Sequence, residues 1–182
     1  VVVNFIQSPN ANAGTDQTFC KNNVGAVQLG GVFNYAAAAT WSGGNGGVFS
    51  NFGSPTSTYT PSPTDIANDS VVIYYSTTGS FFSCPNHTDS MVIYFTPQPI
   101  VDAGPDQLIC SSTNNVQLVG SITGGSTTGT WTTTGTGGFS PSQTALNGQY
   151  VMSGADIAGA SVWLYVESTN NGSCISVKDS LQ

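Results

Sequence analysis

Hydrophobic and polar residues alternate along short stretches of this chain, and turn-forming residues separate these stretches. In one stretch, Val162, Leu164 and Val166 fall on one face of an extended strand, while Trp163 and Tyr165 fall on the other. Gly, Thr, Ser and Asn interrupt such stretches about every ten residues, and the signals for helices are missing. This pattern predicts an all-β protein with many short strands.

We expect about seven strands in each half of the chain, as in an immunoglobulin-like β-sandwich. In the first half they are expected near Gln17–Cys20, Ala26–Phe33, Ala39–Ser42, Thr56–Thr60, Ser70–Thr77 and Ser90–Thr96, with a short one near Phe49. In the second half they are expected near Gln107–Cys110, Asn115–Ile122, Gly129–Thr134, Gly148–Met152, Ser161–Ser168 and from Ile175 onward, with a short one near Phe139.

The two halves have similar sequences. Ala13–Cys20 is nearly the same as Ala103–Cys110, 90 residues later. The similarity continues downstream in Trp41 and Trp131, Phe49 and Phe139, Asp65-Ile66-Ala67 and Asp156-Ile157-Ala158, Cys84 and Cys174, and Asp89-Ser90 and Asp179-Ser180. Self-similarity at a fixed spacing indicates a repeat architecture. The sequence therefore predicts two tandem immunoglobulin-like β-sandwich repeats of about 90 residues each.

The repeat also predicts domain boundaries. Residues 1–8 are expected to be the last strand of a preceding repeat plus a linker, because Val1–Phe5 matches Met91–Phe95. Residues 9–97 form repeat 1, and residues 98–182 form repeat 2 with an incomplete final strand. The sequence is thus expected to be a window of a longer chain. Prolines in the linker Thr96–Pro99 favour an extended conformation, which predicts an elongated rod.

The charge of the chain excludes several partners. Two residues are basic and nine are acidic, which gives a net charge of −7. Nucleic-acid binding needs a basic surface to neutralise phosphates, so a nucleic acid is not an expected partner. An anionic membrane surface is disfavoured for the same reason, and no apolar run approaches the length of a membrane span.

The four cysteines form two equally spaced pairs. Cys20 and Cys84 are 64 residues apart, and so are Cys110 and Cys174. Equal spacing in equivalent repeats favours one disulfide inside each repeat, and with it an oxidising compartment. A four-thiol metal site is the alternative, but no CxxC motif supports it, and His87 has no counterpart in the second repeat.

Motifs for catalysis are missing from the sequence. It contains one His and no GxSxG, HExxH or P-loop motif. Asp65 and Asp69 could be offered as a carboxylate pair, but Asp69 corresponds to Ala160 in the second repeat. We therefore expect this segment not to be an enzyme and to need no cofactor.

Two further kinds of site were weighed, a structural calcium site and an isopeptide crosslink. Asp16, Asp102 and Asp106 lie just beyond the linkers, where acidic residues can bind calcium, but no DxDxDG loop occurs and these residues are also ordinary turn formers. Lys21 and Lys178 are not at equivalent positions, which argues against a Lys–Asn crosslink.

The three tryptophans differ in their expected roles. Trp41 and Trp131 share one position in the third strand, which favours a place in the core. Trp163 corresponds to Val72 and is not part of this shared plan. We therefore expect Trp163 to be partly exposed and available for contact with a ligand.

Three sites share the sequence Asp-Ser-aliphatic, at Ser70, Ser90 and Ser180. This pattern resembles the acceptor motif of the general O-glycosylation system of Bacteroidota. The resemblance implies glycans on these serines. The alternative is that Asp and Ser simply begin exposed strands.

Four features together resemble a known group of proteins: the Ala-Gly-x-Asp-Gln opening, the Val-Gln-Leu-x-Gly strand (Val27–Gly30 and Val116–Gly120), the Thr-Trp strand and the Asp-Ile-Ala turn. They resemble the immunoglobulin-like, PKD-like tandem repeats of giant Bacteroidota cell-surface adhesins, including the SprB-type gliding-motility adhesin. The resemblance implies type IX secretion, display on the bacterial cell surface, and a role in adhesion or gliding motility.

We therefore expect a repeat segment of a large secreted adhesin or filament that acts as a rigid spacer. Its expected partners are neighbouring repeats of the same chain, surface polysaccharide or laterally associated copies. The alternative is a carbohydrate-binding or spacer module of a secreted polysaccharide-degrading enzyme.

Overall fold

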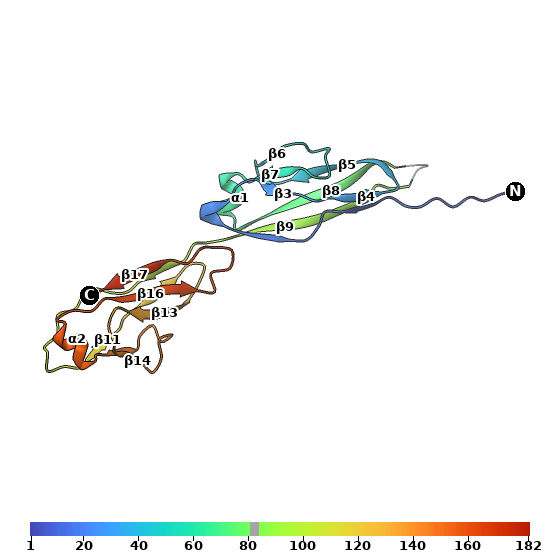
Figure 1. Ribbon diagram of the computed structural model, residues 1–182. Coiled ribbons are helices and arrows are strands. Elements are labelled where there is room, and N and C mark those ends of the chain that lie inside the picture. Colours follow the sequence, from blue (N-terminus) through green and yellow to red (C-terminus); the bar gives the residue numbers. More distant parts are fainter. Residues whose placement is uncertain (81–83) are drawn as a thin grey trace. The chain divides into compact units, whose positions relative to one another are not determined.

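The computed structural model describes residues 1–80 and 84–182. The chain divides into two compact units, Val1–Thr96 and Pro97–Gln182. Strands dominate both units, and each unit contains one five-residue α-helix (Figure 1). No helix in the described part of the chain has the length and apolar character that a membrane span requires.

The first unit contains one four-stranded sheet and one three-stranded sheet. The four-stranded sheet has the order β2-β9-β8-β5, with β2 parallel to β9 and the other neighbours antiparallel. The smaller sheet has the order β3-β7-β6, and β1 pairs with β4. The elements are β1 Asn10–Asn12, β2 Gln17–Cys20, the 3-10 helix η1 Lys21–Asn23, β3 Val27–Gln28, β4 Val32–Asn34, β5 Ala36–Gly43, β6 Val48–Phe49, β7 Thr58–Thr60, α1 Pro63–Ala67, β8 Ser70–Ser80 and β9 Thr88–Thr96.

The second unit has two three-stranded sheets. Their orders are β13-β16-β17 and β11-β15-β14, and β10 pairs with β12. The elements are β10 Ile100–Asp102, β11 Asn115–Gln117, β12 Ser121–Thr123, β13 Thr128–Thr133, β14 Gly138–Ser140, β15 Gln149–Val151, α2 Gly154–Ala158, β16 Leu164–Thr169 and β17 Lys178–Leu181.

Each unit has its own core between its two larger sheets. In the first unit, Trp41 of β5 and Ile73 of β8 pack in one cluster with Tyr59 of β7. In the second unit, Trp131 of β13 packs with Tyr150 of β15 in the same way. Trp41 and Trp131 are 3% and 0% exposed, so the prediction that both belong to the core is confirmed.

The glycine that follows the Val-Gln-Leu strand lies against the buried tryptophan. A Cβ atom at Gly120 would lie 2.6 Å from Cζ2 of Trp131, and one at Gly31 would lie 2.8 Å from Cζ2 of Trp41. Any side chain at these positions would collide with the ring, since real Cβ atoms do not approach so closely. The repeated glycine is therefore explained by close packing.

The Ala-Gly-x-Asp-Gln motif ties the start of each unit to its last strand. In the first unit, the Ala13 N–H donates to Asp89 Oδ2 at 2.9 Å, and the Val92 N–H donates to Asp16 Oδ1 at 2.8 Å. In the second unit, Ala103 donates to Asp179 at 2.8 Å in the same way. The motif residues thus serve to hold the fold together.

The prediction that the chain has no helices is wrong. Both Asp-Ile-Ala segments lie in short helices, α1 and α2, which begin after Ser62 and Ser153. Each helix starts with a capping box, in which the serine hydroxyl accepts the N–H of an aspartate three residues later and the aspartate accepts the N–H of the serine. The Ser-x-x-Asp spacing marks the start of each helix in the sequence, whereas the alternation of hydrophobic and polar residues does not.

One predicted strand is also absent. Gln107–Cys110 was expected to match Gln17–Cys20, but it has no strand conformation, whereas Gln17–Cys20 is β2. The strand β16 also begins at Leu164 and not at Ser161. Both differences occur at the same edge of the second unit, next to the end of β17.

Candidate functional site

Two aromatic side chains and a lysine lie together at the outer face of β16 and β17, and we call them the aromatic strip: Trp163 just before β16, Tyr165 of β16 and Lys178 of β17. The rings of Trp163 and Tyr165 stack with centroids 6.4 Å apart and planes 18° apart. Lys178 Nζ lies 4.2 Å from the centroid of the Tyr165 ring, within the range of a cation–π contact. Trp163 is 40% exposed, so its expected partial exposure is confirmed.

Strand alternation and two hydrogen bonds orient the strip. Leu164 and Val166 are 1% and 0% exposed in the core, so Trp163 and Tyr165, which alternate with them, must face outward. The Trp163 N–H donates to Thr134 Oγ1 and the Thr134 N–H donates to the Trp163 carbonyl, both at 3.1 Å. The backbone of Trp163 is therefore held to β13 even though β16 begins one residue later.

The aromatic strip has the chemistry of a surface that stacks on a flat apolar ligand face. An exposed indole beside a half-buried phenol offers a rigid area with little conformational entropy to lose on binding. The pyranose ring of a sugar presents such a face through its C–H groups. In the first unit, Val72 takes the place of Trp163 and Tyr74 takes the place of Tyr165. The Tyr74 side chain is 43% exposed.

The three candidate acceptor serines share one structural feature: each lies across from an outward-facing tyrosine on the neighbouring strand. The register pairs Ser70 with Tyr94, Ser90 with Tyr74, and Ser180 with Tyr165. Ser90 is exposed, and Ser70 and Ser180 are half-buried. A sugar attached to any of these serines would lie beside an aromatic ring.

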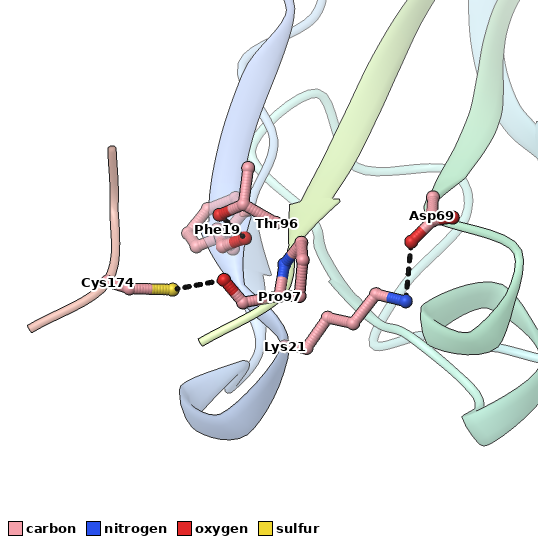
Figure 2. A network of polar contacts seen from close by, with 6 residues as sticks. All are labelled: Phe19, Lys21, Asp69, Thr96, Pro97 and Cys174. Carbon is pink, nitrogen blue, oxygen red and sulfur yellow. Dashed lines mark hydrogen bonds and ion pairs between the residues drawn. The ribbon is translucent and has the colours of Figure 1, made fainter. Parts of the chain in front are cut away.

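The aspartates of these Asp-Ser motifs do not behave alike. Asp89 and Asp179 accept the backbone N–H groups of the Ala-Gly-x-Asp-Gln motifs described above. Asp69 is instead exposed and forms an ion pair with Lys21 at 2.5 Å (Figure 2). Two of the three motif aspartates thus have a structural role that is independent of glycosylation.

A buried tyrosine–aspartate pair recurs in both units. Tyr59 Oη donates to Asp65 Oδ2 at 2.8 Å, and Tyr150 Oη donates to Asp156 Oδ2 at 2.8 Å. Backbone N–H groups of Asn45 and Ser62 also donate to Asp65, both at 2.8 Å. The carboxylate thereby joins the loop after β5 to the start of α1.

These hydrogen bonds shift the pKa values of both partners. Burial alone would raise the pKa of the Asp65 and Asp156 carboxyls, but the donated N–H and O–H groups outweigh it and hold both pKa values below the usual range. Burial, together with the neighbouring carboxylate, raises the pKa of the Tyr59 and Tyr150 hydroxyls. An ionised aspartate that is fully hydrogen-bonded to its own fold is suited to structure rather than to proton transfer.

The acidic residues near the linkers are also engaged by the backbone. Asp102 Oδ1 accepts the Gly104 N–H at 2.8 Å, and Asp106 Oδ1 accepts the Gln182 N–H at 2.9 Å. Among the described residues, no group of three or more His, Cys, Asp or Glu side chains is placed to hold a metal ion. Asp102 thus bonds its own turn, as a turn former does, whereas Asp16 and Asp106 accept N–H groups 76 residues away along the chain.

The pairing that was expected for the cysteines is not the pairing in the structure. Cys110 is exposed and has a free thiol, so a bridge from Cys110 to Cys174 is wrong. The Sγ atom of Cys174 lies 3.4 Å from the Pro97 carbonyl oxygen (Figure 2).

Strand register explains why Cys20 does not pair with Cys84. Cys20 lies opposite Thr96, at the far end of β9 from Thr88, and the eight steps between them span about 26 Å. Cys84 precedes Thr88 by four residues. Even if this segment were fully extended and ran back along the sheet toward Cys20, it would shorten the separation of the two cysteines by only about 13 Å. The remaining gap exceeds the roughly 7 Å between Cα atoms that a disulfide allows.

The single histidine has a structural contact. His87 Nδ1 accepts the Ala11 N–H at 3.1 Å, and the His87 carbonyl accepts the Thr77 N–H at 2.9 Å. These bonds connect β1 to the β8–β9 hairpin. His87, the aspartates and the buried tyrosines described above thus all hold the fold. The aromatic strip of the second unit is the surface that remains as the best candidate for a binding site.

Comparisons with known proteins identify the fold. No family model matches the chain, and no curated protein matches it. Immunoglobulin domains 1–5 of Sidekick-1 superpose with a TM-score of 0.57 at 13% identity, over 97% of this chain and 39% of that chain. Domains 1–4 of Sidekick-1 give a TM-score of 0.53 at 12% identity, over 96% of this chain and 48% of that chain.

The insect immune protein hemolin aligns with a TM-score of 0.47 at 12% identity, over 98% of this chain and 47% of that chain. The chain thus spans less than half the length of each of these three structures. At such low identity, the likeness to Sidekick-1 speaks for the fold alone. The chain has an all-β, immunoglobulin-like fold.

Proposed function

We propose that this chain is a repeat segment of a large secreted adhesin on the surface of a Bacteroidota cell, where it acts as a rigid spacer in adhesion and gliding motility. Export would use the type IX secretion system. Its partners would be neighbouring repeats of the same chain and, in addition, surface polysaccharide or laterally associated copies.

The observation that carries this proposal is the recurrence of the same internal bonds in both units. The tyrosine–aspartate pair, the capping box and the Ala-to-Asp bond occur at matching residues. A module copied in this way adds length at little evolutionary cost, because each copy buries its own core. The polar side chains are used for cohesion, as a spacer requires.

The proposal can be tested by small-angle X-ray scattering of the chain. Two sandwiches end to end, each about 40 Å long, give a radius of gyration of about 24 Å, whereas a compact globule of this length gives about 16 Å. Antibodies raised against the chain should also label intact cells of the source organism and slow their gliding. A radius near the compact value, or labelling only after lysis, would refute the spacer role.

We further propose O-linked glycans on Ser70, Ser90 and Ser180. The tyrosine across from each serine supports this, because its ring would stack on the first sugar and shield it from motion. Mass spectrometry of the protein from its native host should find added sugar on these three serines. Unmodified peptides covering all three sites would contradict the proposal.

A carbohydrate-binding module of a secreted polysaccharide-degrading enzyme is the second candidate, and the stack of the exposed Trp163 on the outward-facing Tyr165 favours it. A glycan array separates the two. Clear binding that Trp163→Ala abolishes, with Val72→Ala as the matched substitution in the first unit, supports this second function. Absence of binding would contradict this second function.

A further inference from the structure

The strand β5 lies at one edge of the four-stranded sheet of the first unit, whose order is β2-β9-β8-β5. It begins with the alanine run Ala36–Ala39, and the whole strand Ala36–Gly43 contains no charged residue and no proline. Edge strands of soluble proteins usually carry such residues, because they stop a second strand from pairing there. Since β5 lacks this protection, we call its first part, Ala36–Thr40, the open edge.

The hydrogen bonds of β5 show which backbone groups the open edge presents. The Trp41 N–H points away from β8, because it donates to the Phe52 carbonyl at 2.7 Å. Backbone groups of alternate residues in a strand point to the same side, so those of Ala37 and Ala39 also point away from β8. Within the described residues, no strand pairs with β5 on that side. The N–H and C=O groups of both alanines are thus presented to a further strand.

The side chains of the open edge leave these backbone groups accessible. Ala39 and Trp41 are 2% and 3% exposed, so their side chains face the core. Ala38 alternates with them and therefore faces outward, and both Ala37 and Ala38 are exposed. Methyl groups do not cover the backbone as longer side chains would. The open edge is therefore flat, uncharged and accessible.

The second unit has a shorter edge at the corresponding place. Ala37 corresponds to Thr127, which lies outside a strand, because β13 begins at Thr128. The Ser126 hydroxyl accepts the Thr128 N–H at 3.1 Å and so occupies the start of this strand. The open edge is thus a feature of the first unit, and the shared plan of the two repeats does not account for it.

We propose that the open edges of two copies of this chain pair as antiparallel strands about a twofold axis at Ala38. Ala37 of each copy then exchanges N–H···O bonds with Ala39 of the other copy. The two Ala38 residues lie directly opposite each other, as a pair without hydrogen bonds whose Cα atoms are about 4.5 Å apart. The two four-stranded sheets thereby become one continuous sheet.

A second copy fits the open edge for two reasons. The edge presents the same groups on either side of Ala38, so it is complementary to itself, as a twofold contact requires. Each copy carries a net charge of −7, so two copies repel each other wherever their charged surfaces meet, and the open edge contains no charge. The inference rests on the proposed function, in which laterally associated copies are partners, and it names the strand that joins them.

Sedimentation velocity of the whole chain tests the proposal. We expect the weight-average mass to rise from one chain toward two chains, with a dissociation constant on the order of 100 µM for so short a contact. Ala38→Lys should weaken association at least about tenfold, because two lysines would face each other across the axis. Val72→Lys adds the same charge on the central strand β8 and should associate like the unchanged chain. Ala38 and Val72 are both exposed, so unchanged melting temperatures will verify that both variants fold.

A mixture of two variants tests the twofold symmetry. Ala38→Glu alone should also fail to associate, for the same reason as Ala38→Lys. An equal mixture of Ala38→Lys and Ala38→Glu should regain association, because the opposite charges then attract each other across the axis. A mixture that associates no better than its separate components overturns the proposal, and so does an equal loss of association in Ala38→Lys and Val72→Lys.

Cysteine variants test the register. They are made with Cys110→Ser, which removes an exposed free thiol. Ala38→Cys should form a covalent dimer on mild oxidation, because a Cα separation of about 4.5 Å suits a disulfide. Ala36 lies opposite Thr40 of the other copy in this register, so Ala36→Cys should not crosslink but A36C/T40C should. Equal dimer yields from Ala38→Cys and Ala36→Cys overturn the proposed pairing.

Failure of this contact and failure of the spacer role give different results. A chain that stays monomeric at every concentration but has the elongated radius of gyration overturns the contact and leaves the spacer role standing. A chain that is compact when dilute, yet dimerises and crosslinks through Ala38, supports the contact and refutes the spacer role.

Discussion

Replacing Asp65 by Asn removes a charge from the core of the first unit with almost no change in shape. The carboxylate is 0% exposed and accepts three hydrogen bonds of 2.8 Å, from the Asn45 N–H, the Tyr59 hydroxyl and the Ser62 N–H. An amide has one oxygen and one NH2 group. Whichever way it is turned, at least one of these donors then faces another donor.

The cost follows from counting these bonds. A hydrogen bond to a charged group contributes about 1.5–3 kcal/mol, and a bond to a neutral group contributes about half as much. One bond is lost and two are weakened, so we expect D65N to lower the free energy of unfolding of the first unit by about 3–5 kcal/mol. For a unit of this size, that corresponds to a fall in melting temperature of at least about 12 °C.

Differential scanning calorimetry at pH 7 measures the effect. The two units are expected to melt as separate transitions, and D65N should shift one of them while D156N shifts the other. Asp69→Asn is the matched control, because the Asp69 side chain is 72% exposed and its ion pair with Lys21 contributes at most about 1 kcal/mol. The reasoning is refuted if D65N shifts its transition by less than about 4 °C, or by no more than D69N does.

Three further predictions concern stability and binding. Folding lowers the pKa values of Asp65 and Asp156, so the stability that these carboxylates contribute is complete above about pH 5 and is lost as the pH falls below about 4. Melting curves in acid should show this loss, and the melting temperature of the double variant D65N/D156N should depend less on pH. Tyr75 is 0% exposed and its hydroxyl has no partner among the described residues, so Tyr75→Phe should raise stability by about 1 kcal/mol in urea unfolding, and a loss of stability would contradict this. Trp131→Ala should destabilise the second unit by about 3–5 kcal/mol through the cavity it leaves, whereas Trp163→Ala should change stability by under about 1 kcal/mol; similar losses would show that Trp163 is structural.

The alternation of hydrophobic and polar residues correctly predicted which side chains around β16 are buried. Leu164 and Val166 are buried and Trp163 is exposed, as alternation requires. The two short helices escaped notice because a single helical turn has no amphipathic period, and only the serine and aspartate three residues apart mark it. The tyrosine partner of each aspartate lies six residues before it, on another element, and no motif connects the two.

The amino-acid sequence by itself determined the all-β class, the repeated core tryptophans and the exposure of Trp163, because burial along a strand follows a period of two residues. Only the tertiary structure decided that the Cys110 thiol is free and which backbone groups the buried aspartates hold. These depend on which strand ends meet across a sheet. Equal spacing along the chain put Cys20 with Cys84, but the register places Cys20 opposite Thr96, at the end of β9 that is farther from Cys84 along the chain.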